Sequence, residues 1–341
     1  MPGVAPKRVE RKREIGIALR SGWCDGRHLV VISARTRTVR PFAAVGVISV
    51  VAIWLALPRV LARIFRVRRA AVDLGPADFE LIADDVTIPG SNGRTLRGWF
   101  VACEMDDRPR PTVLVIHGWN GAANLMLPIA PLLQAAGMHA LFLDARGHGR
   151  SDDDRFASMP RFAEDVEAGL RWLRADPRVE PECVALVGHS VGAGAALLVA
   201  SRDARVAAVV SIAAMAHPGT FMRAAMRARG MPRPVISLVL RGIERTIGLP
   251  FDAFAPVTTI ARLRVPVLLI HGGRDEVVAP TDAILLERAS RGRAQLLTLP
   301  EATHASMEAF LPAAPAIVAF LLDAQHRCPS QILSREGIGR E

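Results

Sequence analysis

The chain has 341 residues, half of them hydrophobic, and a formal net charge of +10. Its length is sufficient to bury the core of one large domain or two smaller ones. The basic excess is confined to the start, because residues 1–70 hold 15 Lys and Arg against 3 Asp and Glu, whereas the remainder holds 28 against 30. A nucleic-acid-binding fold would carry a basic face on its folded domain, so no nucleic acid partner is expected.

An uncharged apolar segment, FAAVGVISVVAIWLAL, occupies residues 42–57 and has arginines on both sides. A helix of this length spans roughly 24 Å, slightly less than a bilayer core of about 30 Å, and apolar residues up to 65 would extend it. Residues 41–65 are therefore predicted to anchor the protein in a membrane as a single N-terminal span. A cleaved signal peptide, which would give a secreted protein, and a core helix are the alternatives.

The flanks of the anchor leave its orientation open, because the positive charges on its two sides are nearly balanced. Residues 1–40 are rich in arginine and lack apolar periodicity, so we expect them to be disordered. A flexible tail is expected over 326–341.

The four cysteines indicate no metal site. Cys24, Cys103, Cys183 and Cys328 lie far apart, without a C-x-x-C motif or Cys/His ligand spacing. A disulfide framework is not implied either. Cys183 begins an apolar run, where a buried, unreactive thiol is expected.

From about residue 73 to 325 the pattern alternates between strands and helices. Short apolar runs separated by helical patterns indicate a mostly parallel sheet with helices on both faces, an α/β fold. The predicted strands cover 95–103, 112–118, 139–147, 183–190, 206–214, 265–273 and 294–300. The predicted helices cover 124–137, 161–175, 191–198, 282–290 and 307–324.

One motif in this domain predicts a nucleophile. The sequence GHSVG, residues 188–192, follows a predicted strand and opens a helix. In that context glycines permit a tight turn that exposes the serine oxygen, while the helix N-terminus stabilises negative charge. Ser190 is the predicted nucleophile.

A serine nucleophile needs a base, and the base needs an orienting carboxylate. Asp275 follows one buried strand and His304 follows the next, so both belong to the strand ends where ligands bind in parallel sheets. Ser190, His304 and Asp275 are thus predicted as a catalytic triad, with Glu276 as the alternative acid. The other histidines beside glycines, which are His117, His148, His189 and His271, are predicted to lie in loops and to bond the backbone.

The oxyanion formed by such a serine needs two N–H donors. One is expected from Val191 at the start of the helix, and the other from Trp119 in the loop after an earlier strand. The stretch DARGHGRS, residues 144–151, is expected to shape a loop near the site without a catalytic role.

Together these motifs resemble the α/β-hydrolase superfamily, from about residue 96 to 324. The similarity is greatest to its serine aminopeptidase-like and lysophospholipase-like hydrolases, some of which carry an N-terminal membrane anchor. The resemblance implies an eight-stranded, mostly parallel sheet with a cap inserted after the sixth strand, at about 216–264, and a hydrolase without a cofactor. The matching residues are Gly98-Trp99-Phe100, His117-Gly118, Asp144, Arg146-Gly147-His148-Gly149, Ser151, Gly188 to Gly192, Asp275 and His304.

The expected activity is hydrolysis of a small acyl ester or thioester, in the manner of a carboxylesterase or lipase, through an acyl-enzyme on Ser190. An amidase or peptidase and an acyltransferase would use the same residues. A non-catalytic binding domain is the alternative of a different class. The expected cap holds eight arginines against Glu244 and Asp252, which suggests either an ordinary solvated face or one that meets an anionic membrane.

Overall fold

The computed structural model describes residues 67–103, 108–304 and 307–328, all of which fall in one compact unit that extends from Ile53 to Glu341. The segments predicted as disordered, 1–40, and as a membrane anchor, 41–65, lie outside the described residues, as does nearly all of the tail. Among the helices that are described, none has the length and apolar character needed to cross a membrane. The anchor at 41–65 therefore stays a prediction.

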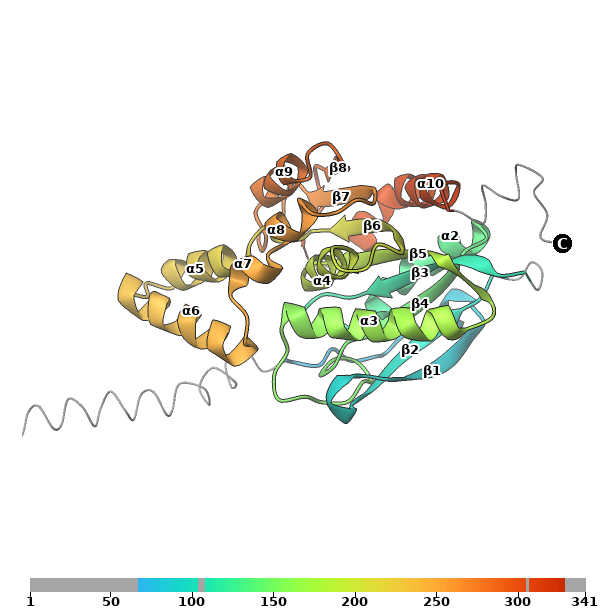
Figure 1. Cartoon of the computed structure of the whole chain (residues 1–341), viewed down its shortest axis with the longest axis horizontal. Coiled ribbons are helices and arrows are strands. Elements are labelled where there is room, and N and C mark those ends of the chain that lie inside the picture. Colours follow the sequence, from blue (N-terminus) through green and yellow to red (C-terminus); the bar gives the residue numbers. More distant parts are fainter. Residues whose placement is uncertain (1–66, 104–107, 305–306, 329–341) are drawn as a thin grey trace, which may run out of the picture. The chain divides into compact units, whose positions relative to one another are not determined.

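The domain is built on an eight-stranded sheet in the order β1-β2-β4-β3-β5-β6-β7-β8 (Figure 1). The first two pairings, β1 with β2 and β2 with β4, are antiparallel, and all the others are parallel. The mostly parallel sheet that the sequence predicted is confirmed. The strands are β1 (Ala83–Pro89), β2 (Thr95–Val101), β3 (Arg110–Ile116), β4 (His139–Asp144), β5 (Val179–His189), β6 (Val206–Ile212), β7 (Val267–Gly272) and β8 (Ala294–Leu299).

The strand β1 was not located from the sequence. Its first three residues are at least partly exposed, and only Val86 and Ile88 are buried. Two apolar residues in alternation are too weak a signal to separate an edge strand from a loop. The antiparallel pairing with β2 supplies the backbone partners that stabilise it.

Helices cover both faces of the sheet because neighbouring side chains of a strand point to opposite faces. On β3, Leu114 and Ile116 belong to one apolar core, and Val113 and Val115 belong to the other. The first core is covered by α3 (Met159–Ala175), α4 (Val191–Ala200), α8 (Pro256–Ile260) and α9 (Pro280–Ala289). The second is covered by η3 (Ala123–Ile129), α2 (Ala130–Ala135), η4 (Met307–Ala313) and α10 (Ala314–Gln325), with η1 (Pro76–Phe79) and η2 (Ser91–Gly93) as short 3₁₀ turns elsewhere.

Two helices predicted as continuous are divided in the structure. Residues 123–129 form a 3₁₀ helix that contains Pro128, and the α-helix α2 begins only at Ala130. The second pair, η4 and α10, follows the same pattern around Pro312. Proline lacks the N–H that a continuing α-helix requires, which explains both interruptions.

The segment predicted as a cap leaves the sheet after β6 and forms α5 (Pro218–Ala228), α6 (Arg233–Ile247) and α7 (Phe251–Phe254) before α8 returns to the core. Helices α5 and α6 lie side by side beyond the carboxyl ends of the parallel strands (Figure 1). Helix α6 buries Ile236, Leu240 and Ile243, which share one helical face, and ends at Gly248 in the left-handed conformation.

The expectation of a free thiol at Cys183 is wrong. Cys183, in β5, forms a disulfide with Cys328, which follows α10. The two Cα atoms are 5.8 Å apart although 145 residues separate them in sequence. Such a pairing depends on the tertiary fold and cannot be deduced from cysteine spacing alone. Cys103 is buried and is not part of a disulfide.

Candidate active site

Ser190 stands at the turn between β5 and α4, with φ of 54° and ψ of −117°. Positive φ is unfavourable for a residue with a side chain and persists only where the surroundings enforce it. Its backbone N–H donates to the carbonyl oxygen of Ile212 on the neighbouring strand, at 2.8 Å. The turn thus holds the serine hydroxyl at the carboxyl end of the sheet.

The two glycines that flank Ser190 in the motif are required by close backbone approach. A Cβ atom on Gly188 would collide with the backbone of Gly192 and Ala193, and one on Gly192 would collide with the carbonyl oxygens of Ile116 and His117. Neither position therefore tolerates a side chain without rearrangement of the turn. The spacing of glycines around the serine is explained by this packing.

The structure brings the three predicted triad residues together. The Nε2 atom of His304 lies 3.0 Å from the Oγ atom of Ser190, and its Nδ1 atom lies 2.8 Å from Oδ2 of Asp275. Ser190 and Asp275 are each 7% exposed. This geometry allows the imidazole to accept the serine proton while the carboxylate orients the ring.

The carboxylate of Asp275 is held in its ionised form. Burial by itself would raise its pKa, but the hydrogen bonds from His304 and from the N–H groups of Val277 and Val278 outweigh burial and lower the pKa below the ordinary value. Those two amides donate to Oδ1 at 2.9 and 2.8 Å, which leaves Oδ2 for His304. Glu276, the alternative acid, is exposed, and it is Asp275 that contacts the histidine.

The two predicted oxyanion donors lie beside the serine. Val191 is the first residue of α4, and the first N–H groups of an α-helix have no partner within the helix. Gly118 packs closely on the turn that holds Ser190, because a Cβ atom added to Gly118 would lie 3.2 Å from Cβ of Ser190. Trp119 directly follows Gly118, and Trp119, Val191 and Ser190 all line one pocket. Their role as donors stays a prediction.

The predicted backbone contacts hold for all four of the other histidines, since His189 has a backbone hydrogen bond at His304. His117 and His148 bond the carbonyl oxygens of Gly118 and Arg146, and Nε2 of His271 lies 3.0 Å from the carbonyl oxygen of Val278. Burial lowers the pKa of His117 to about 4 and that of His148 to about 3, so both rings are neutral at physiological pH.

His189 differs from the prediction in the element to which it belongs and in the rings that it contacts. It is the last residue of β5, not a loop residue, and burial lowers its pKa to about 4. Its ring centroid lies 5.1 Å from that of His304 and 5.9 Å from that of Phe310. His189 thus packs behind the triad histidine as a neutral ring. His271 also lies in a strand, β7, and not in a loop.

A cavity of about 680 Å³ lies over Ser190 and His304 and is roofed by α5, α6 and α7. Its wall contains no Asp, Glu, Lys or Arg side chain among the residues that the structure describes. Apart from histidines and a few small polar residues, the lining is apolar. The cap contributes Pro218, Phe221, Met222, Ile243, Thr246, Ile247, Phe251 and Phe254.

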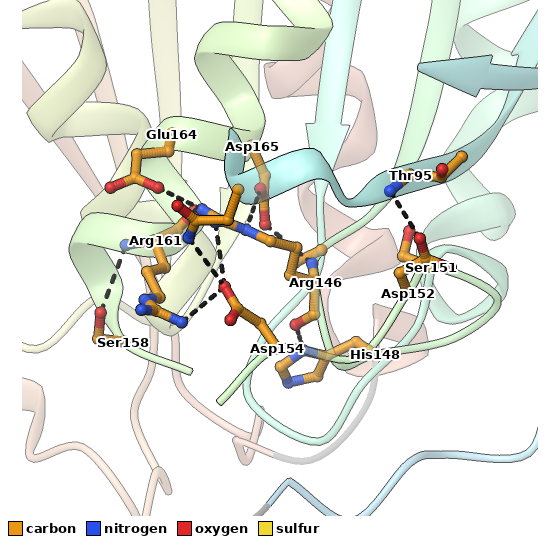
Figure 2. A network of polar contacts seen from close by, with 12 residues as sticks. Thr95, Arg146, His148, Ser151, Asp152, Asp154, Ser158, Arg161, Glu164 and Asp165 are labelled. Atoms are coloured by element: carbon orange, nitrogen blue, oxygen red, sulfur yellow. Dashed lines mark hydrogen bonds and ion pairs between the residues drawn. The ribbon is translucent and has the colours of Figure 1, made fainter. Parts of the chain in front are cut away.

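One wall of this cavity, residues 156–159, belongs to the loop between β4 and α3, and a buried ion-pair network holds that loop (Figure 2). Nε of Arg146 lies 2.7 Å from Oδ1 of Asp165, and its Nη1 atom lies 3.2 Å from Oδ2 of Asp154, which also pairs with Arg161 at 2.6 Å. The side chains of Arg146, Asp154 and Asp165 are at most 5% exposed. Sequence reasoning placed residues 144–151 near the site but did not find this network.

Burial and the neighbouring Arg146 have opposite effects on the pKa of Asp165. Burial raises its pKa to about 7, against the opposing effect of the Arg146 guanidinium and of the Arg146 backbone N–H. Glu164 completes the set through a hydrogen bond with Nη2 of Arg146. The network therefore fixes the start of α3, where Ser158 caps the helix by accepting from the N–H of Arg161.

Comparison with known proteins agrees with this architecture. Residues 107–246 match the family model of serine aminopeptidase, S33, a segment that includes Ser190, α5 and most of α6. Uncharacterized protein YfhR of Salmonella typhimurium is 27% identical over 265 residues, which cover 75% of this chain and 85% of that protein. The thiohydrolase apmlB of Arthrinium phaeospermum is 30% identical over 171 residues, which cover 48% and 52% of the two chains.

Solved structures show the same fold. The esterase Pf2001 of Pyrococcus furiosus superposes with a TM-score of 0.61 at 21% identity, over 76% of this chain and 97% of that one. The α/β-hydrolase GrgF of Penicillium sp. sh18 superposes with a TM-score of 0.56 at 20% identity, over 73% and 100%. The chain therefore has the α/β-hydrolase fold, as its motifs predicted, and its residues 107–246 are similar to the serine aminopeptidase family.

Proposed function

We propose that the protein is a serine hydrolase that cleaves carboxylic ester or thioester bonds of small acyl substrates. The observation that carries this proposal is the chain of contacts Ser190–His304–Asp275 at the floor of a cavity with an uncharged, apolar wall. An apolar cavity of this volume suits an acyl chain. The names of the thiohydrolase apmlB and of the structurally similar esterase Pf2001 point the same way.

In the first half of the proposed reaction, the Oγ atom of Ser190 attacks the acyl carbon while Nε2 of His304 takes the hydroxyl proton. The carbonyl oxygen becomes an oxyanion, which the backbone N–H groups of Val191 and Trp119 stabilise. When the intermediate collapses, the bond to the leaving oxygen or sulfur breaks, and His304 returns its proton to that atom.

The second half regenerates the enzyme. His304 removes a proton from water, the resulting hydroxide oxygen bonds to the acyl carbon, and the Ser190 ester bond breaks. The serine recovers its proton and the acid product leaves. Throughout, the ionised Asp275 stabilises the imidazolium that forms on His304.

The residues that line the cavity favour an ester or thioester substrate over the free amino terminus that an aminopeptidase binds. Recognition of a free amino terminus would call for a carboxylate near the acyl site, and Asp275, which does not line the cavity, is already bonded to His304. The described lining offers no Asp or Glu for that purpose. An uncharged acyl group is the better match to the residues present.

The proposal is tested with a fluorophosphonate probe and a panel of nitrophenyl esters of two to sixteen carbons, using the full chain and Ser190→Ala. We expect probe labelling and hydrolysis in the wild type, and neither in Ser190→Ala. A wild type that is folded by circular dichroism but that neither labels nor hydrolyses any ester would refute the proposal. The matched variant Ser201→Ala removes a hydroxyl at the other end of α4, where it bonds Leu198, and should remain active.

A further inference from the structure

The two long helices of the cap have opposite chemical faces. On α5, Phe221 and Met222 line the cavity, whereas Arg223 and Arg227 are exposed. On α6, Ile243 and Ile247 line the cavity, and Arg241 and Arg245 are exposed. At 100° per residue, the arginines of each helix fall on the side away from its cavity-lining residues.

The positions of these arginines do not all favour the helices. Arg223 and Arg227 are four residues apart, as are Arg241 and Arg245, and like charges at this spacing repel each other. Arg233 is the first residue of α6, where a positive charge opposes the helix dipole. Only Arg227 and Arg245 lie in the last turns of α5 and α6, where the dipole favours a positive charge, so local stability does not account for the other three.

The cap has only two acidic side chains, Glu244 and Asp252, against its eight arginines, and Oδ1 of Asp252 lies 2.8 Å from Nε2 of His217. Glu244 is the acidic residue of α5 and α6, and its Oε1 atom accepts a hydrogen bond from the N–H of Phe251. In the described part of the chain, no ion pair involves Arg223, Arg227, Arg233 or Arg241. Several arginines elsewhere in the described chain are paired, for example Arg174 with Asp203 and Arg178 with Asp176.

Apolar side chains accompany this charge. Val235 and Leu249, close to Arg233 and Arg245 in sequence, are 44% and 37% exposed. Leu125 and Val277 line the cavity and are yet 47% and 54% exposed, so the cavity reaches the surface between apolar side chains. A surface with negative charges outside and hydrocarbon beneath would match both kinds of residue.

We propose that the cap basic face, formed by Arg223, Arg227, Arg233, Arg241 and Arg245, docks on an anionic phospholipid membrane, from which an acyl substrate enters the cavity. An acidic protein would match the charges but not the apolar side chains around the cavity. The supply of acyl substrate rests on the proposed hydrolase activity, whereas docking itself does not.

The test measures binding of the full chain to vesicles of phosphatidylcholine alone and of phosphatidylcholine with phosphatidylglycerol. The cap variant changes Arg223, Arg227, Arg233 and Arg241 to Gln. The matched control changes four exposed arginines on other elements, Arg94, Arg171, Arg288 and Arg291, to Gln. Both variants lose the same net charge, and both keep residues 1–66, so any binding through that segment is common to all three proteins.

We expect the wild type to prefer anionic vesicles and the cap variant to lose at least tenfold in anionic-vesicle affinity, since a basic residue near such a surface contributes about 1 kcal/mol, or roughly fivefold. The control should lose less than threefold, and added salt should weaken the wild type more than the cap variant. Equal losses in both variants, or a wild type without anionic preference, would overturn the proposal.

Hydrolysis of soluble nitrophenyl butyrate is measured in parallel and should be unchanged in both variants. If the wild type neither labels with the fluorophosphonate probe nor hydrolyses any ester of the panel, while anionic-vesicle binding still depends on the cap, the proposed hydrolase function fails and the docking stands. If hydrolysis is normal but the vesicle preference is absent, the docking fails and the hydrolase function stands. The two proposals are thereby separated.

Discussion

The Nδ1–H of His117 donates a 2.7 Å hydrogen bond to the carbonyl oxygen of Gly118, while its Nε2 atom accepts from the N–H of Ala145 at 3.1 Å. A trans peptide points its C=O and the following N–H in opposite directions. The bond to Gly118 therefore fixes the direction of the N–H of Trp119, the proposed oxyanion donor.

Replacing His117 by Phe should lower kcat on nitrophenyl butyrate by about 100-fold with little change in KM, since an oxyanion donor acts mainly in the transition state. His117→Asn, which can keep a donor near the Nδ1 position, should lose less than tenfold. Binding of an alkyl boronic acid, whose tetrahedral adduct mimics the oxyanion, should weaken in the same order. Equal losses of kcat in the two variants would show that the hydrogen bond from His117 to Gly118 does not control catalysis.

Asp275→Asn should lower kcat by about 10⁴-fold at neutral pH, because an amide cannot hold the imidazole with its Nε2 atom free to accept the serine proton. Steady-state kinetics and the rate of fluorophosphonate labelling both report this loss. The neighbouring exposed acid gives the matched control, and Glu276→Gln should stay within twofold of the wild type. Loss of activity in Glu276→Gln with retention in Asp275→Asn would reverse the assignment of the acid.

Arg146→Met should lower the free energy of unfolding by about 3–5 kcal/mol, because it leaves the buried Asp165 carboxylate without its arginine partner and removes one of the two arginines that pair with Asp154. The double variant Arg146→Met with Asp165→Leu should recover part of that loss. Arg202→Met, which removes a pair with Glu167 in which the arginine is 46% exposed, should cost less than about 1 kcal/mol. Urea denaturation measures all three, and a double variant weaker than the single one would contradict the pairing argument.

The protein should lose stability as the pH falls below about 6.5. His117, His148 and His189 have folded-state pKa values of about 4, 3 and 4, below the unfolded value of 6.5. The unfolded chain therefore takes up protons that the fold excludes, which lowers stability from pH 6.5 towards pH 4 by about 1.4 kcal/mol per pH unit for each histidine. Asp165, whose pKa burial raises to about 7, holds a proton in the fold that the unfolded chain releases, and so offsets about one of the three histidine contributions. Urea midpoints across this range measure the slope.

The control for that slope is His148→Asn, because His148 lies away from the triad and an amide can keep a donor to the Arg146 carbonyl. Its slope between pH 6 and 4 should be smaller by about half, because the proton held by Asp165 in the fold already offsets one of the three histidines. A slope unchanged by the substitution would mean that His148 is not excluded from protonation in the fold.

Ile247→Trp should shorten the preferred acyl chain, because Ile247 lines the cavity from α6 and the larger indole would fill part of it. We expect kcat/KM for esters of twelve or more carbons to fall at least tenfold, with butyrate esters within threefold. Leu249→Trp adds the same ring at an exposed position just beyond the helix and should not change the profile. A uniform loss across all chain lengths would indicate that the cavity does not hold the acyl chain.

The sequence was most informative where a short motif required a particular backbone. Gly188, Ser190 and Gly192 impose a turn that their spacing predicts, and Asp275 and His304 follow apolar runs that form the buried strand β7 and the partly exposed edge strand β8. Once those strands lie parallel, their carboxyl ends meet at one edge, which brings together residues more than one hundred positions apart. The location of the cap followed from the length of the connection after β6.

The features that the sequence did not predict depend on contacts between distant segments. Cys183 finds Cys328 only because α10 packs on β6, the neighbour of β5 in the sheet, and Arg146 meets Asp165 only after α3 has packed on the sheet. The edge strand β1 depends on β2 for its hydrogen bonds. The breaks at Pro128 and Pro312 had a local signal that the apolar periodicity concealed.

The disulfide between Cys183 and Cys328 has a topological consequence for the site. It closes a covalent ring that contains Ser190, the whole cap, Asp275 and His304, so every residue of the triad lies between the two sulfur atoms along the chain. A protease that cut the exposed connection near Gly230 would give two pieces still joined through sulfur. Those pieces would separate on a denaturing gel only after reduction, and a nicked cap could remain seated over the serine.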